Sequence, residues 1–212
     1  MNLKAVLFDF DGTLVDTNQV IMNSWYATFD GMGVPRPSDE VILKTFGEPL
    51  VRSLENFFPG KVDETIVIYR HYQETHYKEF LAIYDGIKEL LETLKGMGLR
   101  LAIVTSRLPH STVEYMSLFD IQDYFEVLVT CADTDKHKPE PEPCLLALEK
   151  LGIKAEDAIM IGDSRFDILC AQNAGVPGVF VNWSQAADRS DLGCKPDYII
   201  DKPMDLIDII RG

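Results

Sequence analysis

Short uninterrupted runs of apolar residues recur along this chain, and they alternate with segments whose apolar residues fall three or four positions apart. The runs have the length and composition of strands that are buried on both faces, and the spaced segments are typical of amphipathic helices. Six strands are predicted, at residues 5–8, 101–104, 127–129, 158–161, 179–181 and 198–200. Because strands that alternate with helices form a parallel sheet covered on both faces, the predicted fold class is α/β with a doubly wound parallel sheet.

The stretch from Asn18 to Phe80, between the first two predicted strands, contains only helical patterns. Capping residues and apolar spacing predict four helices, which begin near Asp16–Thr17, Ser38, Pro49 and Asp63. In the second of these helices we expect Val41, Ile42 and Thr45 to face inward. We call the stretch from Asn18 to Phe80 the helical insert.

The alternation of strands and helices resumes at Asp85–Gly86, so the insert interrupts an otherwise regular fold. If its two connections lie near Val15 and Tyr84, the insert would lie as a lid over the end of the first strand. The predicted organisation is therefore a Rossmann-like core of residues 1–15 and 83–212 and a small all-helical cap domain of residues 16–82.

Composition narrows the class of partner. The chain has 212 residues, of which 46% are hydrophobic and 25% charged, as expected for one globular core with a small insert. Its net charge of −14 argues against nucleic acid or an anionic membrane as the main partner, although local cations would still admit a small anionic substrate. The four scattered cysteines indicate free thiols, and no signal peptide or membrane-spanning run is visible. We expect a cytoplasmic protein, either a monomer or a homodimer.

Polar residues follow four of the predicted strands, and they suggest chemistry. The four groups are Asp9 with Asp11, Thr105 with Ser106, Lys138, and Asp163 with Asp167. Ligands of open α/β sheets bind at the carboxyl ends of the strands, so we expect these side chains to converge. Carboxylates that converge without a cation repel one another, so a cation lies among them or their pKa values rise. An oxygen-only ligand set suits Mg²⁺, and with a lysine and hydroxyl groups it forms a phosphoryl-transfer site.

Each group also has a purely structural explanation. Asp11–Gly12 is a common turn, and Thr105–Ser106 could cap the helix that follows. Lys138 could be a solvated loop residue, although the prolines beside it favour a stiff segment. Ser164 and Asp167 resemble a capping pair. Four such groups in order at four strand ends favour the chemical interpretation.

Together these residues resemble a known family, the haloacid dehalogenase-like hydrolases, over essentially the whole chain. The motifs that carry the resemblance are Asp9–Leu14, Thr105, Lys138–Pro139 and Gly162–Asp167. The resemblance implies that Asp9 is the nucleophile and forms an aspartyl-phosphate. Asp11 would be the general acid that protonates the leaving oxygen and afterwards the base that activates water.

The same resemblance implies roles for the remaining residues. Thr105 and the Ser106 amide would hold the phosphoryl group, and Lys138 would pair with Asp9 and with the phosphate. The implied cofactor is Mg²⁺, and its ligands would be Asp9, the Asp11 backbone carbonyl and Asp163, with Asp167 nearby.

The helical insert resembles the cap of phosphoglycolate phosphatases, pyrophosphatases and β-phosphoglucomutases. The stretch Phe46–Leu50 followed by Arg52 is closer to the phosphoglycolate phosphatase and pyrophosphatase branch. Arg52 could bind a second negative group of the substrate or lie on the surface. The polar and aromatic cluster from Tyr69 to Tyr77 is interpreted mainly as the packed side of a helix, with substrate contact as the alternative.

The leading hypothesis is a Mg²⁺-dependent phosphatase, a phosphoric monoester hydrolase, that acts on a small phosphorylated metabolite such as phosphoglycolate or pyrophosphate. A β-phosphoglucomutase-like phosphomutase is the second enzymatic hypothesis. A receiver-type signalling module also uses a phosphorylatable aspartate, a threonine and a lysine on a similar sheet. The helical insert and the acid two residues after Asp9 argue against such a module.

Overall fold

The computed structural model describes residues 3–186 and 192–212, and it confirms the predicted parallel sheet. Six parallel strands lie in the order β5-β4-β1-β6-β7-β8. Their bounds are Ala5–Phe8 for β1, Arg100–Val104 for β4, Val127–Val129 for β5, Ala158–Gly162 for β6, Gly178–Val181 for β7 and Tyr198–Ile200 for β8. The chain builds one half of the sheet as far as β5 and then crosses to β6 on the other side of β1. This reversal of strand order at β1 is where α/β sheets open a ligand crevice.

The central strand β1 is buried on both faces because its side chains alternate between two cores. Val6 and Phe8 join the apolar cluster formed with α5, α6 and α9. Ala5 and Leu7 join the cluster formed with α7 and α8. The helices of the core are α5 Ile87–Gly96, α6 Pro109–Leu118, α7 Glu142–Leu151, α8 Arg165–Asn173 and α9 Asp205–Arg211. A strand held between two apolar layers gives its carboxyl end a fixed position.

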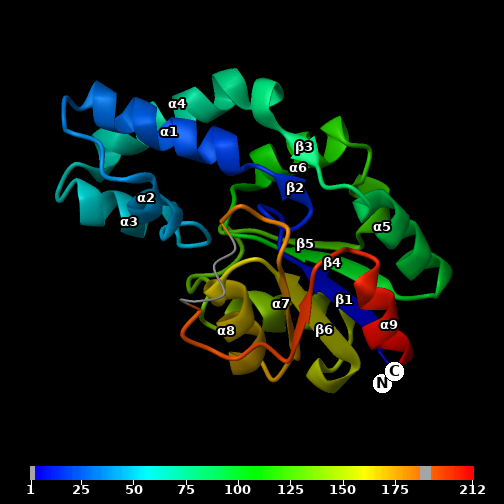
Figure 1. Cartoon of the computed structure of the whole chain (residues 1–212). Helices are drawn as coiled ribbons and strands as arrows, with labels where there is room; N and C mark the ends of the chain where they lie inside the picture. Colours follow the sequence, from blue (N-terminus) through cyan, green and yellow to red (C-terminus); the bar gives the residue numbers. More distant parts are fainter. Residues whose placement is uncertain (1–2, 187–191) are drawn as a thin grey trace.

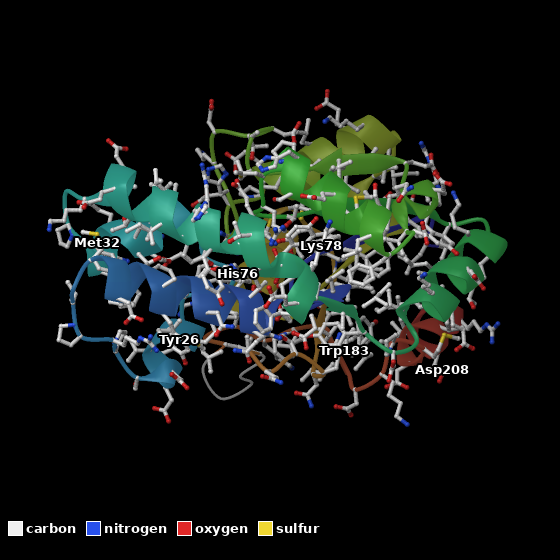
Figure 2. The ribbon with its side chains drawn as sticks, turned by 90° about the horizontal axis from the view of Figure 1, so that it is seen from above. Tyr26, Met32, His76, Lys78, Trp183 and Asp208 are labelled. Atoms are coloured by element: carbon white, nitrogen blue, oxygen red, sulfur yellow. The ribbon has the colours of Figure 1, made fainter. Side chains whose placement is uncertain are left out.

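The helical insert has an apolar core of its own, built around Trp25, Phe29 and Leu54. Its helices are α1 Asn18–Gly31, α2 Asp39–Leu43, α3 Leu50–Phe57 and α4 Val62–Phe80. Figure 1 shows them gathered on one side of the molecule, away from both chain ends. Seen from above in Figure 2, α4 runs alongside α1, and Tyr26 and Met32 lie far from Asp208 of α9.

Two details of the insert differ from the sequence-based expectation. Its entry and exit, β2 Val15–Asp16 and β3 Ala82–Ile83, pair as a short antiparallel ladder that was not predicted. Val41 is 44% exposed and does not face inward, because the one-turn helix α2 buries Ile42 alone. The predicted connections near Val15 and Tyr84 lie at this ladder. The division into residues 1–15 with 83–212 and residues 16–82 stays a proposal.

Within the described part of the chain, no helix combines the length and the apolar character that crossing a membrane requires.

Candidate active site

Asp9 and Asp11 follow β1 at the edge of the sheet where the strand order reverses. The backbone of Asp9 still belongs to the sheet, since its N–H donates to the Ile161 carbonyl at 2.8 Å. Gly12 then turns the chain with a φ of +75°, a value that L side chains rarely adopt. A Cβ built on Gly12 would lie 1.9 Å from Oδ2 of Asp163, so a glycine is needed here for both conformation and space.

Lys138 joins the carboxyl end of β1 to the start of α8. Its Nζ donates to Asp9 Oδ1 and to Asp167 Oδ1, both at 2.6 Å, and to the Val104 carbonyl at 3.2 Å. The side chain is only 3% exposed. Burial by itself lowers the pKa of this amine, but the charges of Asp167 and Asp9 outweigh it and hold the pKa above its ordinary value. Lys138 is therefore a fixed cation of the site rather than a solvated loop lysine.

Asp167 serves the helix and the site at once. It forms a capping box with Ser164 at the start of α8, in which its Oδ2 accepts from the Ser164 N–H at 3.1 Å and from the Ser164 hydroxyl. Its other oxygen accepts from Lys138. The capping interpretation of this pair is thus confirmed, and it coexists with a place in the carboxylate cluster.

Three carboxylates form a group that could hold a metal ion. Asp9, Asp163 and Asp167 each offer an oxygen, these oxygens lie within 4.8 Å of one another, and all three residues are buried. Burial and the charge of Asp167 raise the pKa of Asp9 well above its ordinary value. Burial, followed by the charge of Asp167, raises the pKa of Asp163 to about 7. The shifts express repulsion among the carboxylates that Lys138 only partly offsets, so the residues fit a divalent cation with oxygen ligands.

Asp11 does not join that group; its side chain pairs with Arg107. Nη1 of Arg107 donates to Asp11 Oδ1 at 3.0 Å, and the guanidinium carbon lies 4.2 Å from the ring centre of Tyr115. Arg107 was not predicted from the sequence, although a cation directly after Thr105–Ser106 was the available signal. Ser184, after β7, was not predicted either; it hydrogen-bonds to Asp163 and accepts from Asn18 at 3.4 Å.

Thr105 lies at the end of β4, where its N–H donates to the Val129 carbonyl at 2.9 Å. Its hydroxyl oxygen accepts from the Arg107 N–H at 3.2 Å. The N-cap of α6 is Leu108, so Thr105 and Ser106 do not cap that helix and the structural explanation for them is wrong. Both residues line the same cleft as Asp9.

Comparison with known proteins decides the family. The family model described as haloacid dehalogenase-like hydrolase matches residues 6–181. This chain belongs to that family. A relative from Caldanaerobacter subterraneus subsp. tengcongensis is 42% identical over all of this chain and 96% of its own length, and one from Halalkalibacterium halodurans is 34% identical over 99% and 98%. Both bear the name pyrophosphatase PpaX, which is provisional for the first.

Solved structures agree with the family assignment. A haloacid dehalogenase-like hydrolase from Streptococcus pneumoniae superposes with a TM-score of 0.87 at 28% identity and covers 98% of both chains. A structure described provisionally as a phosphoglycolate phosphatase, from Lactobacillus plantarum, superposes with the same TM-score at 27% identity, over 99% of this chain and all of its own.

In this haloacid dehalogenase-like chain, Asp9 and Asp163 line a cleft of about 710 Å³ between the core and the insert, whereas the Asp167 side chain is fully buried. Arg52 lines the cleft, but its side chain is 68% exposed and pairs with Glu48 at 3.1 Å. Tyr69 and Tyr77 are buried packing residues, with ring centres 5.2 Å from Trp25 and 4.9 Å from Tyr115 respectively. Both tyrosines therefore pack against other rings, and they also line the cleft, as do their neighbours Arg70, Gln73 and Glu74. Contact of this cluster with substrate stays an alternative to packing alone.

Proposed function

We propose that this chain is a Mg²⁺-dependent phosphatase that hydrolyses a small phosphorylated metabolite, phosphoglycolate-like or pyrophosphate-like, through an aspartyl-phosphate. The observation that carries the proposal is the buried Asp9 bonded to Lys138, with Asp163 and Asp167 within 4.8 Å, at the base of the cleft. The pyrophosphatase and phosphoglycolate phosphatase names among the relatives support the substrate class.

The proposed roles follow from the charges and contacts. Mg²⁺, when bound by Asp9, Asp163 and the Asp11 carbonyl with Asp167 nearby, would neutralise negative charge on the phosphoryl oxygens. Asp9 attacks the phosphorus, so that one difficult displacement becomes two easier ones. Lys138 orients Asp9 and offsets charge on the phosphoryl group.

The second set of roles concerns the proton and the phosphoryl oxygens. Thr105 and the Ser106 N–H hold the oxygens of the transferred group from the end of β4. Asp11 gives its proton to the leaving oxygen, and in the second step its carboxylate removes a proton from the attacking water. The phosphomutase alternative shares these steps and differs only in what accepts the phosphoryl group.

The test of the proposal is the variant Asp9→Asn, assayed with inorganic pyrophosphate and 2-phosphoglycolate in the presence of Mg²⁺. We expect a folded protein with turnover reduced by at least about 1,000-fold and no acid-labile phosphoprotein, because an amide is a poor nucleophile. Asp30→Asn, on the outer surface of the insert, is the matched control and should retain activity. Retained turnover in Asp9→Asn would remove the nucleophile from the proposal.

A further inference from the structure

Arg107 is a buried cation on the wall of the cleft whose hydrogen-bonding capacity is not fully used. Its side chain is 7% exposed, and Asp11 takes Nη1. Its Nε is buried and has no hydrogen-bond partner among the residues that the structure describes. A guanidinium presents a planar fork of donors that matches the two oxygens of a carboxylate or a phosphate. A desolvated guanidinium that has an unmet donor and belongs to a residue lining the cleft is a binding group for an anion.

The backbone of Arg107 is fixed next to the residues proposed to hold the phosphoryl group. Its N–H donates to the Thr105 hydroxyl oxygen at 3.2 Å, and its carbonyl accepts from the Cys131 N–H at 3.1 Å. The stacked ring of Tyr115 supports the guanidinium from one side. Arg107 therefore lies on the rigid core, two residues beyond Thr105, with its fork on the side of the cleft where Asp11 lies.

We infer that Arg107 determines specificity by binding the second anionic group of the substrate, the phosphate or carboxylate that is not transferred, in exchange for Asp11. This inference rests on the proposed function and names its substrate class more closely, as phosphate compounds with a second negative group. Arrival of that group releases the Asp11 side chain, which lines the cleft and is 24% exposed. The freed carboxylate takes up a proton from solvent, and this proton is the one that it gives to the leaving oxygen. A leaving group without a second charge leaves the ion pair intact.

Arg52 is a weaker candidate for the same task. Its side chain is 68% exposed and already bonds Glu48, four residues earlier, so an anion bound there would compete with water and with that carboxylate. An anion bound by Arg107 loses its water in a buried position and gains a stronger charged hydrogen bond. Selectivity for a second anion is therefore assigned to Arg107.

The experiment compares kcat/KM for inorganic pyrophosphate and 2-phosphoglycolate with kcat/KM for ethyl phosphate. Ethyl phosphate has one phosphate and, like 2-phosphoglycolate, an alcohol leaving group that needs a proton, but it has no second anionic group. In Arg107→Met we expect the ratio of kcat/KM for each substrate with a second anionic group to kcat/KM for ethyl phosphate to fall about 10- to 100-fold, the range of a lost charged hydrogen bond. Arg107→Lys keeps the charge without the fork and should restore part of the ratio.

The matched control is Arg36→Met. Arg36 also pairs with an aspartate, Asp30, and its guanidinium carbon also lies over a tyrosine ring, 4.5 Å from the centre of Tyr26, but it lies outside the cleft. In Arg36→Met, the ratios of kcat/KM values should stay at their wild-type values. If Arg107→Met lowers kcat/KM equally for all three substrates, Arg107 only positions Asp11 and the inference is overturned.

A binding measurement separates this inference from the proposed function. By calorimetry in Mg²⁺, Asp9→Asn should bind inorganic pyrophosphate more tightly than inorganic phosphate, and the double variant Asp9→Asn/Arg107→Met should lose about 10-fold or more of that preference. This binding measurement does not depend on turnover. Wild-type protein that hydrolyses none of the three substrates overturns the proposed function, whereas an unchanged preference in the double variant overturns the role of Arg107.

Discussion

The core and the helical insert face the same cleft with charged groups that are held very differently. On the core side, Lys138 bonds two buried carboxylates and a backbone carbonyl. On the insert side, Arg52 is largely exposed and pairs only locally with Glu48. Buried ions keep one geometry because each needs its partner, whereas exposed ions exchange partners with water at little cost. The contrast supports the proposal that the core carries both the reaction and the contact with the second anion, whereas Arg52 of the insert can change partners.

Removal of Lys138 should produce the largest effect. In Lys138→Met, two buried carboxylates lose their shared cation, and breaking a buried pair in this way costs about 3–5 kcal/mol. We expect the thermal midpoint to fall by roughly 6–20 °C and turnover to fall by at least about 1,000-fold. Differential scanning calorimetry and a phosphate-release assay measure both changes.

Lys136→Met is the matched control in the same loop. Lys136 pairs with Glu142 at 2.9 Å, and its side chain is well exposed. The control should shift the midpoint by no more than about 2 °C, because exposed ion pairs contribute little. Equal effects of the two substitutions would contradict the contrast between buried and exposed charges.

A second comparison uses two glycines, one in each region. Gly12→Ala places a Cβ within 1.9 Å of Asp163 and forces a side chain into a positive φ. We expect a loss of about 2–4 kcal/mol in the free energy of unfolding and a weaker affinity for divalent cations, because Asp163 must move. Gly33, in the insert, also has a positive φ, but a Cβ built on it would meet nothing within 4 Å. Gly33→Ala should therefore lower the free energy of unfolding by only about 1 kcal/mol. Urea unfolding and calorimetric titration with Mg²⁺ report both, and similar losses in the two variants would refute the steric argument.

The pH dependence of stability should show a smaller effect at Asp163. Its pKa in the folded protein is about 7, whereas the ordinary value is 3.8, so the folded protein keeps a proton that the unfolded chain has lost. Stability is therefore lost as pH rises from about 4 to about 7. In the absence of divalent cations, Asp163→Asn should not lose stability in this way. Its free energy of unfolding relative to wild type should rise by on the order of 2–4 kcal/mol as pH rises across that range, and it should rise no further at higher pH.

Asp133→Asn provides a control of opposite sign. Although burial raises the pKa of Asp133, the hydrogen bonds from Thr130 together with the charge of Lys150 outweigh it and lower the pKa below the ordinary value. Asp133 therefore contributes stability above a pH of about 4, and its variant should be less stable than wild type at neutral pH. Thermal midpoints measured from pH 4 to 8 distinguish the two cases. If the stability gained by Asp163→Asn does not grow with pH, the pKa of Asp163 is not raised in the folded protein.

The sequence predicted the core well because the relevant signals are local. Apolar runs gave each sheet strand to within one residue, and polar residues directly after β1 and β6 are those that meet at the edge of the sheet. The pair Arg107–Asp11 was not predicted, because Arg107 lies outside the motifs that carry the family resemblance and nothing near it indicates a partner 96 positions away. The ladder of β2 and β3 has two residues a side, too few for a pattern, and the inward placement of Val41 failed because a one-turn helix has no established face.

The central claim is that acidic side chains at separate strand ends together hold one divalent cation. The most direct test is anomalous diffraction from crystals soaked in Mn²⁺, a substitute for Mg²⁺ that scatters strongly. We predict one strong peak among the carboxylates of Asp9 and Asp163, and its loss in Asp163→Asn. A saturating soak that leaves this position without a peak, or that places the ion elsewhere, would contradict the account.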